Sequence, residues 1–165
     1  MTILVAYGSK RGGTEGLAQM IGDALREAGH DVDVVSAQAA GRGGLDRVDA
    51  VIVAGGLYAQ RWHGDARRFV RRHGKALAKR PVWLVASGPL DESADDGALP
   101  DVPQVAAAAE AIGARGTATF GGYLAADAKG FPASAMARNG KAGDWRSPER
   151  VTAWASTVHA ELAGA

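Results

Sequence analysis

A loop rich in glycine and hydroxyl groups is the segment of this sequence with the clearest chemistry. It reads Gly8-Ser9-Lys10-Arg11-Gly12-Gly13-Thr14 and stands between an apolar run and a segment of helical periodicity. At such a junction the free backbone N–H groups and the positive end of the helix dipole point to one place, which favours an anion. Ser9 and Thr14 add hydroxyl donors, and Gly12 and Gly13 let the backbone come close to a ligand. The loop therefore predicts a phosphate site.

Two common phosphate loops are excluded by the residues that they need. Gly8 and Gly13 have the spacing of a P-loop, but Thr14 stands where an ATP- or GTP-hydrolysing enzyme needs lysine. A dinucleotide fingerprint needs another glycine pattern and a carboxylate at the end of the second strand. That strand ends Val34-Val35-Ser36 and has no carboxylate there. A phosphate monoester is left as the expected ligand group.

Strands and helices alternate around this loop. Continuous apolar runs predict buried strands, and apolar residues spaced by three and four predict amphipathic helices. The strands are expected at residues 3–7, 32–35, 50–54, 82–86 and 117–120, and the helices at 15–28, 66–77, 102–112 and 148–162, with a short helix within 37–44. The pattern predicts a doubly wound α/β fold, with a five-stranded parallel sheet and helices on both faces. Such folds bind ligands beyond the C-terminal ends of their strands. Residues 125–147 carry no clear pattern.

The composition narrows the possible classes of function. The chain has 165 residues, 47% of them hydrophobic, and we expect one domain over residues 1–165. Its net charge of +1 does not favour nucleic acid as a partner. The absence of cysteine excludes thiolate chemistry and iron–sulfur clusters, so any redox chemistry needs a bound cofactor. The four histidines show no metal-ligand spacing, and no apolar run approaches the roughly 20 residues of a membrane span. We therefore expect a cytoplasmic protein without a metal site or an integral membrane segment.

Two segments resemble a known family. The loop from Ser9 to Thr14 resembles the phosphate loop of flavodoxins, and the run from Leu45 to Gly55 is similar to that family's approach to its third strand and flavin-contacting loop. The resemblance implies a flavodoxin-like sheet with strand order 2-1-3-4-5. Within the superfamily, the residues from Gly56 to Tyr58, the run from Phe69 to His73 and the pair Asp144-Trp145 most resemble the menaquinone-dependent protoporphyrinogen oxidase branch.

The resemblance implies FMN as the cofactor and three loops as its site. Tyr58 is then the first candidate to stack on the flavin ring and Trp62 the second, while Gly55 and Gly56 let a peptide turn toward the ring edge. No residue is assigned a covalent catalytic role. The implied cofactor-binding residues are Ser9, Lys10, Arg11, Gly12, Gly13, Thr14, Gly55, Gly56, Leu57, Tyr58, Ala59, Trp62, Ser87, Gly88, Pro89 and Leu90.

Several functions agree with these residues. The first is an FMN-dependent electron carrier or oxidoreductase, whose partner is a redox protein or a small electron acceptor such as a quinone. The second is hydride transfer with the deazaflavin F420. Its anionic tail would suit Lys10, Arg11 and the arginine-rich segment from Arg61 to Arg72, and its different ring would tolerate the lack of an aromatic residue in the loop after the fourth strand. The third is a binding module without redox turnover. The oligomeric state stays open. A cluster of five arginines is either a solvated helix face or a contact for carboxylates or phosphates: Arg61, Arg67, Arg68, Arg71 and Arg72.

Overall fold

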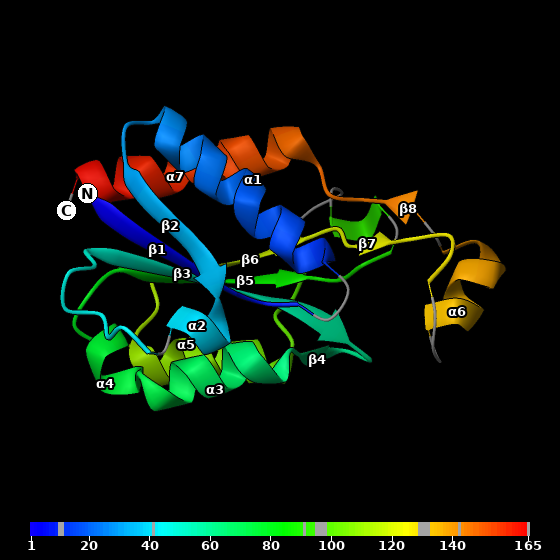
Figure 1. The fold of residues 1–165 in the computed structure, drawn as a ribbon, viewed down its shortest axis with the longest axis horizontal. Helices are drawn as coiled ribbons and strands as arrows, with labels where there is room; N and C mark the ends of the chain where they lie inside the picture. Colours follow the sequence, from blue (N-terminus) through cyan, green and yellow to red (C-terminus); the bar gives the residue numbers. More distant parts are fainter. Residues whose placement is uncertain are drawn as a thin grey trace.

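The five apolar runs form one parallel sheet in the computed structural model (Figure 1). Its strands are β1 (Thr2–Gly8), β2 (Asp31–Ser36), β3 (Ala50–Tyr58), β5 (Val82–Ser87) and β6 (Gly116–Phe120), in the order β2-β1-β3-β5-β6. This order confirms the predicted order 2-1-3-4-5, since β5 and β6 are the fourth and fifth predicted strands. The structure describes residues 1–9, 12–40, 42–90, 92–94, 99–128, 133–141 and 143–164, so Lys10, Arg11, Asp95, Asp96 and the run Gly130-Phe131-Pro132 lie outside the described residues.

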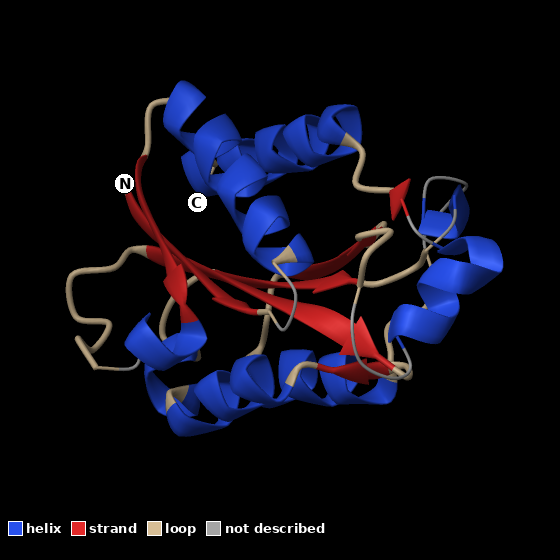
Figure 2. Cartoon of the chain, turned by 45° about the vertical axis from the view of Figure 1, so that its right-hand side comes forward, coloured by secondary structure: helices blue, strands red, loops and turns tan. Residues whose placement is uncertain are grey.

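Helices cover both faces of the sheet (Figure 2). On one face α1 (Gly13–Glu27) and α7 (Pro148–Ala163) lie side by side and enclose a core with alternate residues of the central strands, among them Val5 and Ile52. On the other face α2 (Ala37–Ala40), α3 (Gly64–Arg72), α4 (Gly74–Leu77) and α5 (Pro103–Ile112) enclose a second core, which includes Leu4 and Val53. Alternation of strand side chains between the two faces gives each core its residues, so both cores require uninterrupted apolar strands.

The predicted helix over residues 66–77 is two helices. α3 ends at Arg72, and α4 begins at Gly74. His73 between them has φ −103° and ψ 17°, outside the α-helical region, although its carbonyl still accepts a hydrogen bond from the Leu77 N–H at 2.9 Å. The apolar face predicted for this segment is preserved across the break, because Ala66, Phe69, Val70 and Leu77 are all buried.

Further elements lie beside the C-terminal edge of the sheet. β3 continues past the predicted strand to Tyr58 and forms an antiparallel hairpin with β4 (Arg61–Trp62). The stretch without a sequence pattern contains α6 (Ala133–Met136), the turn η2 (Ala137–Lys141) and β8 (Gly143–Asp144), and β8 pairs with β7 (Tyr123–Leu124). The short helix η1 (Glu92–Ala94) follows β5. Within the described ranges no helix is long and apolar enough to cross a membrane.

Candidate functional site

A cavity of about 570 Å³ lies at the C-terminal edge of the sheet. The ends of β1, β3 and β5 contribute to it because parallel strands bring their C-terminal ends to one side. Eleven of the sixteen residues predicted to bind a cofactor line it: Ser9, Gly13, Thr14, Gly56, Leu57, Tyr58, Ala59, Ser87, Gly88, Pro89 and Leu90. The tertiary structure therefore brings the three loops of the sequence prediction together.

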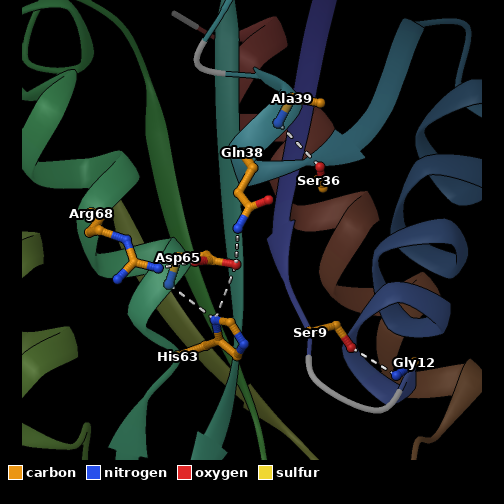
Figure 3. A network of polar contacts seen from close by, with 8 residues as sticks. All are labelled: Ser9, Gly12, Ser36, Gln38, Ala39, His63, Asp65 and Arg68. Carbon is orange, nitrogen blue, oxygen red and sulfur yellow. Dashed lines mark hydrogen bonds and ion pairs between the residues drawn. The ribbon is translucent and has the colours of Figure 1, made fainter.

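The start of α1 forms the polar end of this cavity. The Gly12 N–H donates a hydrogen bond to the Ser9 Oγ at 3.0 Å (Figure 3), and Gly12 takes a left-handed φ of 82° immediately before the helix. The first N–H groups of α1, beginning at Gly13, have no partner within the helix. Thr14 is buried, and no hydrogen bond from its hydroxyl to another described residue exists. These donors and the helix dipole together create a place for an anionic group.

Gly56 brings the backbone of β3 close to this polar end. A Cβ atom at Gly56 would stand 3.0 Å from the Thr14 Oγ1, and its next neighbour would be the Ser87 carbonyl oxygen at 4.0 Å. Because Gly56 has no side chain, the space beside the Thr14 hydroxyl is open. A ligand there can reach both this hydroxyl and the Gly56 backbone.

The hairpin after β3 forms one rim of the cavity. Its two turn residues, Ala59 and Gln60, have φ values of 47° and 62°, which residues other than glycine adopt at a cost. Both are exposed, and both line the cavity. The Gly56 carbonyl accepts a hydrogen bond from the His63 N–H at 2.9 Å, so the hairpin holds the peptide that the sequence suggests is free to turn.

Gly55 and Trp62 correct two of the predicted contacts. Gly55 faces the α3 side of the sheet, where a Cβ atom would collide with the Trp62 ring and with Ala66. Trp62 is 1% exposed, and its Nε1 donates a hydrogen bond to the Val85 carbonyl at 3.1 Å. Neither residue lines the cavity, because Trp62 belongs to the core beneath the hairpin and Gly55 faces that core. Trp62 supports the hairpin and does not face the cavity.

His63 joins the cavity to the start of α3. Its Nδ1 accepts a hydrogen bond from the Asp65 N–H at 3.1 Å, which caps the helix, and this assigns the ring proton to Nε2 in the neutral form (Figure 3). The Asp65 carboxylate lies 4.0 Å from the same nitrogen, pairs with the Arg68 guanidinium and accepts a hydrogen bond from the Gln38 amide. His63 is thus a polar group on the cavity wall whose orientation is set by the helix cap.

The opposite wall comes from residues that the sequence did not single out. Part of it precedes and begins α5, and part belongs to β7 and α6: Leu99, Pro100, Asp101, Val102, Val105, Tyr123, Leu124, Ala133 and Met136. Tyr123 and Met136 are 40% and 36% exposed. The solvent-exposed Tyr123 ring supplies an aromatic group that the loop after β5 lacks. An aromatic residue three positions after the end of the fifth strand is the sequence signal that points to it.

Arg146 fastens β8 and β7 to the start of α1. Its guanidinium makes two hydrogen bonds to the Asp144 carboxylate, at 2.8 and 2.9 Å, and lies 4.9 Å from the centre of the Tyr123 ring. It also donates to the Gly13 carbonyl at 3.2 Å. The hydrogen bonds from Arg146 lower the pKa of Asp144 below its ordinary value, which keeps the carboxylate charged. The wall that carries Tyr123 is therefore tied to the helix that forms the anion site.

Comparisons with known proteins agree with this architecture. The family model described as Flavodoxin domain matches residues 4–131. Among solved structures, oxidised flavodoxin 2 from Bacillus cereus has a TM-score of 0.60 at 20% identity, over 98% of this chain and 99% of that one. A point mutant of flavodoxin from Pseudomonas aeruginosa has a TM-score of 0.57 at 15% identity, with 97% of both chains covered.

A larger protein contains the same fold. Rubredoxin oxygen:oxidoreductase from Desulfovibrio gigas has a TM-score of 0.67 at 14% identity and is matched by 99% of this chain. The chain spans only 36% of that protein's length. A search of curated proteins finds no match.

Proposed function

The chain belongs to the flavodoxin domain family, and from that premise we propose that it binds FMN in the cavity at the sheet edge and takes part in electron transfer. The single observation that carries the proposal is Thr14, a buried residue at the start of α1 whose hydroxyl lies beside Gly56, next to an apolar cavity that can take a flat ring. FMN needs two environments side by side: a polar one for its phosphate and an apolar one for its isoalloxazine ring.

The residues of the chain have distinct tasks in this proposal. Ser9, the N–H groups at the start of α1 and the Thr14 hydroxyl hold the phosphate, because each can donate a hydrogen bond to an anionic oxygen. When bound, FMN supplies the one- and two-electron chemistry that the protein side chains lack. Lys10 and Arg11 belong to the same loop in the sequence, and we assign them to the phosphate on that ground alone.

The ring belongs to the apolar part of the cavity. Tyr58 on the hairpin and Tyr123 on β7 are the two tyrosines of its wall, and Leu57 and Pro89 add apolar surface. Aromatic side chains stack on flat rings and exclude water from them. The hairpin peptide held by His63 presents a fixed backbone edge to the ring, which sets the electrostatics around it.

The electron partner is a redox protein or a small acceptor such as a quinone. The narrower resemblance to protoporphyrinogen oxidases stays a prediction, and it is tested with FMN-loaded protein by following the oxidation of a porphyrinogen with and without a quinone. F420 also stays a prediction. Of the residues that suggest it, Lys10 and Arg11 lie outside the described part of the chain, and none of the arginines between residues 61 and 72 lines the cavity.

The absorbance spectrum of the purified protein tests the cofactor directly. We expect protein mixed with FMN to keep a two-band flavin spectrum after size-exclusion chromatography. Riboflavin is the matched control, because it has the same ring without the phosphate, and we expect it to be lost on the column. If the protein keeps the single absorption band of F420 but loses FMN, F420 replaces FMN as the proposed cofactor. If the protein keeps neither cofactor, the result supports the third function, a binding module without redox turnover.

A further inference from the structure

Positive charge is concentrated in one short part of the chain. Residues 59–81 contain eight of the 19 lysines and arginines but only one of the 18 acidic residues. This segment therefore has a net charge of +7, whereas the rest of the chain has −6. The net charge of +1 is therefore the sum of a strongly basic segment and an acidic remainder. A charge distribution of this kind steers oppositely charged partners to one surface.

The tertiary structure spreads five of these cations along one surface. Four lie on α3, on the side away from its buried residues, and one lies on β4; we call them the basic surface: Arg61, Arg67, Arg68, Arg71 and Arg72. Arg67 is half-buried and the other four are exposed. α3 extends along one side of the molecule, with β4 at its N-terminal end (Figure 1). The four arginines of α3 thus span about 8 Å along the helix axis, at a rise of roughly 1.5 Å per residue.

The cations of the basic surface are largely unpaired. Arg68 pairs with Asp65, but no acidic residue in the described part of the chain forms an ion pair with Arg61, Arg67, Arg71 or Arg72. Residues 67 and 71 and residues 68 and 72 are also like charges four apart on a helix, an arrangement that destabilises the helix. Arg71 and Arg72 lie in the last turn of α3, where a cation interacts favourably with the helix dipole, but no ion pair within the described residues accounts for Arg61, Arg67, Arg71 or Arg72.

The basic surface adjoins the mouth of the cavity. Ala59 and Gln60 are exposed residues of the cavity wall, and Arg61 follows them directly in the hairpin. Tyr58, which lines the cavity, is the cross-strand partner of Arg61. A molecule bound on the basic surface would therefore stand beside the opening of the cavity.

We propose that the basic surface docks a protein partner through a carboxylate-rich patch on that partner. That the partner exchanges electrons at this site rests on the proposed function, whereas the docking itself does not. A protein fits the surface better than a nucleic acid or a membrane. The apolar residues of this region, Trp62, Phe69 and Val70, are all buried, so none can stack on a base or enter a lipid layer. The −6 charge of the remaining chain also repels a polyanion that extends past the surface.

Binding of an acidic probe protein tests the proposal. The probe is a plant-type [2Fe–2S] ferredoxin with an acidic surface, titrated calorimetrically against the whole chain at about 20 mM and about 300 mM salt. We expect binding at low salt that is largely lost at high salt. The triple variant Arg67→Gln, Arg71→Gln and Arg72→Gln should weaken low-salt binding roughly tenfold, because each ion pair contributes a factor of about two.

A matched variant controls for net charge alone. Arg42, Arg47 and Arg115 are exposed cations outside the basic surface, and their triple replacement by glutamine removes the same charge. This control should change binding by less than about twofold. Equal weakening by both triple variants would overturn the proposal, as would failure of the ferredoxin to bind at low salt. If duplex DNA or phosphatidylserine vesicles bind more tightly than ferredoxin and are weakened by the same triple variant, the partner is a nucleic acid or a membrane and the proposed protein partner is wrong.

The two proposals fail separately in this design. Titrations are made on protein with and without added FMN. Ferredoxin binding without flavin uptake refutes the proposed function and leaves the docking surface. Flavin uptake without ferredoxin binding refutes only the docking surface.

Discussion

Two adjacent glycines of β3 allow the core and the cavity to be perturbed separately. Successive residues of a strand face opposite sides of the sheet, so alanine at Gly55 points toward Trp62 and alanine at Gly56 points toward Thr14. Neither glycine has a left-handed backbone, so the added methyl group acts through space alone. The two variants differ by one position in the chain and by the environment that the methyl group enters.

The structure sets different magnitudes for the two changes. In Gly55→Ala the new Cβ would stand 2.8 Å from the Trp62 Cδ1 and 2.9 Å from the Ala66 Cβ, both buried and without free space. Overpacking of this kind costs about 1–3 kcal/mol. For a chain of this size, that lowers the melting temperature by roughly 2–12 °C.

In Gly56→Ala the methyl group would contact only the Thr14 hydroxyl, at 3.0 Å. The hydroxyl can move by a few tenths of an ångström, so we expect the free energy of unfolding without ligand to change by less than about 1 kcal/mol. The displaced hydroxyl would lose the hydrogen bond that we propose it makes to the phosphate, which would be worth about 1.5–3 kcal/mol, so FMN affinity should fall roughly 10- to 100-fold.

Thermal unfolding followed by circular dichroism, with FMN titrations by fluorescence, measures both quantities. We expect Gly55→Ala to lose stability while its folded fraction keeps near-normal FMN affinity, and Gly56→Ala to show the reverse. An unchanged melting temperature for Gly55→Ala would refute the packing of Trp62. Unchanged FMN affinity for Gly56→Ala would refute the place assigned to the phosphate.

Two further changes test the anion site and the histidines. Thr14→Val keeps the shape of the side chain and removes its hydroxyl, so FMN affinity should fall roughly 10- to 100-fold while riboflavin affinity stays the same, as measured by fluorescence titration. An equal loss for both ligands would contradict the role of the hydroxyl. Burial lowers the pKa of His30 and of His73 below the ordinary 6.5, so the unfolded chain binds more protons in mild acid. Stability should therefore fall as the pH decreases from 7 through 6.5 toward the folded-state values. Urea unfolding at several pH values measures this slope, and a His30→Asn, His73→Asn variant should show a shallower one.

Local sequence patterns were enough to predict the architecture and the loop before α1 that forms the polar end of the cavity. Uninterrupted apolar strands require cover on two faces, and helical periodicity from residue 15 predicts a helix after the loop that follows β1, where α1 begins at Gly13. These features depend on residues that are close together in the chain, so residue types and their spacing are enough to predict them. The strand order was expected from the family resemblance, and the sheet confirms it.

The rest of the site depends on contacts between distant segments. The sequence placed Gly55 and Trp62 at the cofactor, but the pairing of β3 with β4 turns both toward the core, because a shift of one residue in a strand exchanges its faces. Tyr123 meets α1 through Arg146, which is 133 residues from Gly13 in the chain. Arg61 comes to lie beside the cavity mouth only when the hairpin pairs it with Tyr58. Each of these depends on long-range packing and pairing, which no local spacing encodes.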